Sequence, residues 1–62
     1  MMLEPLDIFK IQNNGTYLWK GAVKNLELAQ LRVEQLATNA PGRYLIYSQI
    51  TGEKTVVPLD AT

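Results

Sequence analysis

The stretch that decides the fold is NLELAQLRVEQLATN, Asn25–Asn39, where apolar residues recur with helical spacing over a long segment. At about 100° per residue, one face of this segment gathers Leu26, Ala29, Val33, Leu36 and Ala37. Asn25 is a favourable N-cap, because its side-chain oxygen accepts a hydrogen bond from an unpaired amide of the first turn. Pro41 prevents the helix from continuing, and Gly42 favours a turn after it. The segment predicts a helix of about four turns.

The segment before this helix has the pattern of a β-hairpin. Leu6–Gln12 is dense in Leu, Ile and Phe, as expected of a strand, and Asn13-Asn14-Gly15 supplies turn residues. A three-residue turn places Ile11 opposite Tyr17, Phe9 opposite Trp19, and Asp7 opposite Gly21. A two-residue turn at Asn14-Gly15 would shift the pairing by one residue and move one strand's side chains to the other face. We favour the first register, because it gathers the aromatic residues on one face.

The segment after the helix predicts a second hairpin. Arg43–Gln49 and Thr55–Leu59 read as strands, joined by a turn at Thr51-Gly52. Pro58 cannot donate a ladder hydrogen bond, so the last strand should lie at an edge of the sheet or end there.

The expected fold class is therefore α+β: two β-hairpins form an antiparallel sheet, and one α-helix packs on one face (ββαββ). Residues 1–62 should form a single small α+β domain. Because Gly21 has no side chain, we expect the helix to approach the sheet on the aromatic face. The predicted core is Phe9, Ile11, Trp19, Leu26, Ala29, Val33, Leu36 and Ile46.

Composition excludes several classes of function. The chain contains no Cys and no His, which removes disulfides, thiolate chemistry and the commonest zinc ligand and general base. No carboxylate cluster, Gly-rich phosphate loop or activated nucleophile is evident, so we expect no enzyme, no catalytic residues, no metal and no cofactor. No apolar run approaches the ~20 residues of a membrane span, and no secretory signal is recognisable. A cytoplasmic setting is expected.

Apolar residues left over by the helix and the sheet predict an interaction surface. The free sheet face would expose Ile8, Leu18, Leu45 and Tyr47, and Leu28 and Leu31 point away from the buried side of the helix. Leu28 and Leu31 fit either a contact surface or ordinary isolated exposed leucines. A short chain with such a surface favours a homodimer or another protein partner.

The sequence therefore predicts a small, non-enzymatic, self-associating or protein-interaction module. The alternative is a weak binder of single-stranded nucleic acid that stacks bases on the aromatic residues of the open sheet face. The equal numbers of acidic and basic residues argue against this alternative, because nucleic-acid binders usually carry a basic excess.

Four segments form a recognisable pattern: Asn14-Gly15-Thr16-Tyr17-Leu18-Trp19, the helix, Pro41-Gly42-Arg43-Tyr44-Leu45-Ile46-Tyr47 and Thr51-Gly52-Glu53. In this pattern the chain resembles short uncharacterised bacterial proteins that read strand-strand-helix-strand-strand. The resemblance covers most of residues 8–53 and consists of turn and core residues. It implies the fold and no activity, ligand or catalytic residue.

Overall fold

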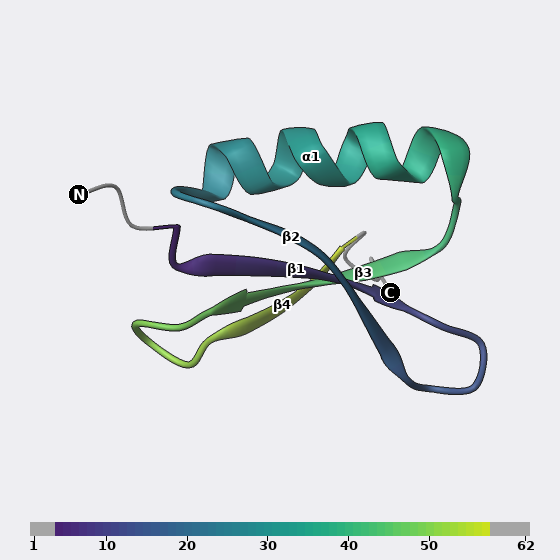
Figure 1. Ribbon diagram of the computed structural model, residues 1–62, viewed down its shortest axis with the longest axis horizontal. Helices are drawn as coiled ribbons and strands as arrows, with labels where there is room; N and C mark the ends of the chain where they lie inside the picture. Colours follow the sequence, from purple (N-terminus) through teal and green to yellow (C-terminus); the bar gives the residue numbers. More distant parts are fainter. Residues whose placement is uncertain (1–3, 58–62) are drawn as a thin grey trace, which may run out of the picture.

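The computed structural model describes residues 4–57 and confirms the α+β fold. Four antiparallel strands form one open sheet in the order β2-β1-β3-β4, and one helix packs against it (Figure 1). The elements are β1 (Leu6–Ile11), β2 (Tyr17–Val23), α1 (Leu26–Asn39), β3 (Arg43–Ser48) and β4 (Lys54–Val57). Strand β4 lies at an edge, as expected, whereas Pro58 and Leu59 lie outside the described residues.

Helix α1 begins at its predicted N-cap, but its C-cap is Ala40, with a negative φ, and not Asn39 in the left-handed conformation that the sequence predicted. The Asn25 side chain accepts a hydrogen bond of 2.8 Å from the Leu28 amide, so Asn25 is the N-cap. Glu27 places a negative charge in the first turn, where it meets the positive end of the helix dipole. At the other end, the Ala40 amide donates to the Leu36 carbonyl at 2.8 Å, one residue before Pro41.

The β1–β2 hairpin has the favoured register near its turn and a β-bulge farther along. Phe9 pairs with Trp19, and the Gln12 amide donates to the Thr16 carbonyl, as a three-residue turn requires. Beyond Trp19 the register shifts, so that Asp7 pairs with Ala22. The predicted pairing of Asp7 with Gly21 is therefore wrong. Lys20 is the extra residue of the bulge.

The bulge decides which side chains face the helix. Because one residue is inserted into β2, Gly21 and Val23 move to the sheet face that carries Ile8. Gly21 has a φ of +145°, a conformation that residues with a side chain rarely adopt. Gly21 thus makes the bulge possible, and the bulge adds Val23 to the core.

The core lies between α1 and the face of the sheet that carries Ile8. Its buried residues are Ile8, Val23, Ala29, Val33, Tyr44 and Ile46, with Leu36 partly buried against them. The prediction was right for Ala29, Val33, Leu36 and Ile46.

Other residues of the predicted core lie elsewhere. The other face of the sheet, away from α1, carries Phe9, Ile11 and Trp19. Phe9 and Ile11 lie on the opposite face of β1 from Ile8, because side chains alternate along a strand, and Trp19 pairs with Phe9. Ile8, Val23 and Ala29 are buried together in the core between the sheet and the helix. Leu26 is 50% exposed, because it lies in the first turn of α1 at the rim of a hollow.

Candidate functional site

The face of the sheet opposite α1 is the largest candidate site, and strand pairing defines its members. Directly paired residues on neighbouring strands lie on the same face. Among residues 4–57, no other element lies against this face, which Figure 1 shows on the side of the sheet away from the helix. We call it the open face; it comprises Asp7, Phe9, Ile11, Tyr17, Trp19, Ala22, Arg43, Leu45, Tyr47, Lys54 and Val56.

Most of the open face is apolar. Its large apolar residues are Phe9, Ile11, Tyr17, Trp19, Leu45, Tyr47 and Val56. Tyr17 is 59% exposed and Trp19 is 58% exposed, which is unusual for rings of this size. Leu45 is only 6% exposed, so its neighbours on the sheet already shield it. The result is a contiguous patch with a buried centre and an exposed aromatic side along β2.

Two sets of contacts hold the side chains of this patch in place. The rings of Phe9 and Tyr17 lie with their centroids 6.2 Å apart and tilted by 56°, a favourable arrangement for aromatic pairs. The Trp19 indole Nε1 donates to Asp7 Oδ1 at 3.2 Å. Gln49 Nε2 donates to Asp7 Oδ2 at 2.7 Å. Both oxygens of the carboxylate are thus engaged, and the indole has a fixed partner.

The structure places the four predicted interface residues of the sheet in three locations. Leu45 and Tyr47 lie on the open face, although Leu45 is nearly buried and not exposed as the sequence predicted. Ile8 is fully buried under α1, so its assignment to a free face is wrong. Leu18 pairs with Lys10 on the helix side of the sheet. It is 45% exposed, since it lies near the hairpin turn beside Ala40, where α1 has ended.

Sequence reasoning missed Phe9, Tyr17 and Trp19 as surface residues, because it assigned the aromatic face to the helix. One signal was available. A glycine inside a strand often marks a bulge, and the bulge at Lys20, next to Gly21, reverses the face on which Val23 lies. Val23, which lies beyond the bulge, then marks the face of the sheet that packs against the helix.

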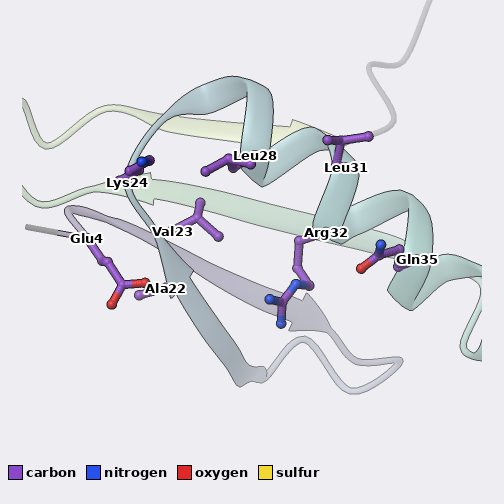
Figure 2. Close-up of a pocket in the computed structure, with 8 residues that line it drawn as sticks. All are labelled: Glu4, Ala22, Val23, Lys24, Leu28, Leu31, Arg32 and Gln35. Atoms are coloured by element: carbon purple, nitrogen blue, oxygen red, sulfur yellow. The ribbon is translucent and has the colours of Figure 1, made fainter. Parts of the chain in front are cut away.

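Leu28 and Leu31 lie on the outer side of α1 and are 37% and 50% exposed. They do not belong to the open face. Together with Ala22 and Val23 of β2, they line a groove between the helix and the edge of the sheet (Figure 2).

No group of three Asp or Glu residues within residues 4–57 is placed to hold a metal ion. Burial raises the pKa of the Tyr44 hydroxyl, which donates a 2.6 Å hydrogen bond to the Ala40 carbonyl. This hydroxyl ties β3 to the end of α1. Among the same residues, no helix has both the length and the apolar composition that a membrane crossing requires.

Comparison with family models, with curated proteins and with solved structures gives no match for this chain. The resemblance to short bacterial proteins therefore stays a prediction. A function has to be argued from the two surfaces, the open face and the groove.

Proposed function

We propose that this chain is a small, non-enzymatic interaction module that associates with a second copy of itself through the open face. The observation that carries the proposal is the apolar patch on that face, with Tyr17 and Trp19 each more than half exposed. Contiguous apolar patches of several hundred Å² usually mark interfaces. A two-fold dimer lets one such patch cover its own copy.

Size and charge favour a weak dimer. Strands spaced about 4.8 Å apart, each about six residues long at about 3.3 Å per residue, give an open face of roughly 400 Å² per copy. The total of roughly 800 Å² lies below the usual size of stable interfaces, so we expect a weak, transient dimer of micromolar rather than nanomolar affinity. The formal net charge of zero adds no long-range repulsion between copies.

Equilibrium sedimentation across a concentration series tests this proposal. We expect the parent chain to change from monomer to dimer within about 10 to 500 micromolar, the range of a weak interface. Trp19→Lys should shift the transition at least about tenfold upward, because it places a charge in the apolar contact. Leu18→Lys is the matched control, since Leu18 lies between Tyr17 and Trp19 in sequence but on the other face. A strict monomer throughout, or equal effects of both variants, would contradict the proposal.

A second candidate function is binding of single-stranded nucleic acid on the same face. The exposed rings of Tyr17 and Trp19 favour it, because bases stack on such rings. On the same face Asp7 repels phosphates, whereas Arg43 and Lys54 carry the opposite charge. Fluorescence anisotropy of a labelled oligonucleotide at two salt concentrations separates the two candidates. Binding that weakens steeply with salt and is reduced in Trp19→Ala would support the nucleic-acid function.

A cytoplasmic setting and a bacterial origin belong to the same proposal. The absence of cysteine is compatible with a reducing compartment. The non-enzymatic assignment rests on the apolar character of the open face, which suits a contact with another protein.

A further inference from the structure

The groove beside β2 is a second surface, separate from the open face. Its volume is about 320 Å³, at the lower end of the range for ligand pockets. Figure 2 shows Glu4 and Lys24 at one end, Gln35 at the other, and Arg32 reaching from α1 toward the strands. The apolar part of the lining consists of Ala22, Val23, Leu28 and Leu31.

The strand that borders the groove is an edge strand. Because β2 is the outermost strand of the sheet, its outward backbone amides and carbonyls have no strand partner among residues 4–57. The bulge at Lys20 interrupts this edge, and the part of β2 beyond it, Ala22 and Val23, lies along the groove together with Lys24, which directly follows the strand. An extended chain added to that part of the edge would direct every second side chain toward the apolar lining.

The charges around the groove favour a partner with acidic side chains. Lys24 and Arg32 line it, against a single carboxylate from Glu4, and neither cation forms an ion pair within the described residues. The Arg32 guanidinium lies over Gly21, with Nη1 3.9 Å from the position that a Cβ there would occupy. Two copies joined through this edge would bring their cations together. A chain that alternates apolar and acidic side chains complements both the groove and its rim.

We propose that the groove and the adjacent edge of β2 bind an extended acidic–apolar peptide segment by strand addition. Backbone hydrogen bonds to residues 22–24 fix the register of the bound peptide. Apolar side chains of the peptide enter the groove over Leu28 and Leu31, and its carboxylates meet Lys24 and Arg32. Apart from Ala22, this surface has no residue in common with the open face, so both can be occupied at once.

The probe is a fluorescein-labelled octapeptide of alternating valine and glutamate, acetylated and amidated, followed by anisotropy. We expect saturable binding that weakens as salt rises, because exposed ion pairs contribute to it. The matched valine–lysine peptide should not bind. A valine–glutamate peptide with N-methylated valines should also fail, since it lacks the amides that strand addition uses.

Variants of the protein locate the contact. Arg32→Gln should weaken binding by about fivefold, whereas Lys54→Gln removes the same charge from the opposite edge strand and should leave binding unchanged. On peptide addition, backbone amide NMR signals should shift at residues 21–24 and along residues 28–35 of α1. Equal binding of the lysine or N-methylated peptide would overturn the proposal. Shifts confined to the open face, or shifts at residues 21–24 that follow protein concentration without peptide, would also overturn it.

Discussion

At the scale of single residues, Ile8 and Trp19 distinguish the two faces of the sheet. Ile8 is fully buried under α1, and Trp19 is 58% exposed. We expect Ile8→Ala to lower the free energy of unfolding by about 2–5 kcal/mol. Trp19→Ala should cost about 1 kcal/mol, from partial burial and one hydrogen bond. Urea denaturation at low micromolar concentration measures both effects.

Because a domain of this size is marginally stable, Ile8→Ala can abolish folding altogether. Ile8→Val is the graded variant and should cost about 0.5–1.5 kcal/mol. A larger loss for Trp19→Ala than for Ile8→Ala would mean that the aromatic face is the one that packs on the helix.

Tyr44 gives the second prediction at this scale. Its buried hydroxyl donates to the Ala40 carbonyl at 2.6 Å, and Tyr44→Phe should cost about 0.5–1.5 kcal/mol by leaving that acceptor unpaired. Burial raises the pKa of this hydroxyl above its usual value near 10. The folded state therefore holds the proton more tightly than the unfolded state.

The Tyr44 contribution to stability should be complete below about pH 10 and should fall as pH rises toward the folded-state pKa. Comparing the parent with Tyr44→Phe isolates this effect from the titration of the other tyrosines and the lysines. An equal decline in stability for both proteins above pH 10 would contradict the assignment.

At the scale of elements, local signals in the sequence were sufficient for some features. The helix and its N-cap, the three-residue turn and the edge position of β4 followed from periodicity, capping and turn residues. The order of the strands did not follow, since it depends on which strands meet after the chain folds back. The helix-covered face was missed for a narrower reason. Strand β1 carries apolar residues on both faces, so its own sequence does not show which face the helix covers. Only the bulge at Lys20, next to Gly21, distinguishes the two faces.

The bulge can be tested directly. Gly21 adopts a φ of +145°, and a Cβ built there meets only the end of Arg32 at 3.9 Å. The cost of Gly21→Ala should thus come from backbone strain rather than from a clash, at about 1–3 kcal/mol. A chemically synthesised chain with D-alanine at this position is the control, because D-residues favour positive φ. If the L- and D-alanine chains unfold at the same urea concentration, the backbone explanation is wrong.

At the scale of the whole molecule, one helix covers one face of a four-stranded sheet. A chain of 62 residues buries only about 60% of its unfolded surface and gains little stability from its own core. The open face holds apolar area that no other element among residues 4–57 covers. Association is therefore expected to supply stability as well as recognition, which links the proposed function to folding.

This link predicts that stability depends on protein concentration. If the folded dimer unfolds to separate chains, its apparent free energy of unfolding per dimer should rise by about 1.4 kcal/mol for each tenfold increase in concentration. Thermal unfolding of the parent should accordingly shift to higher temperature between about 10 and 500 micromolar, the range of a weak interface. Tyr17→Lys should abolish the shift, because Tyr17 lies on the open face and is 59% exposed, outside the monomer's core. Leu18→Lys should keep it, since Leu18 lies on the helix side. A parent melting temperature independent of concentration would exclude the dimer as a source of stability.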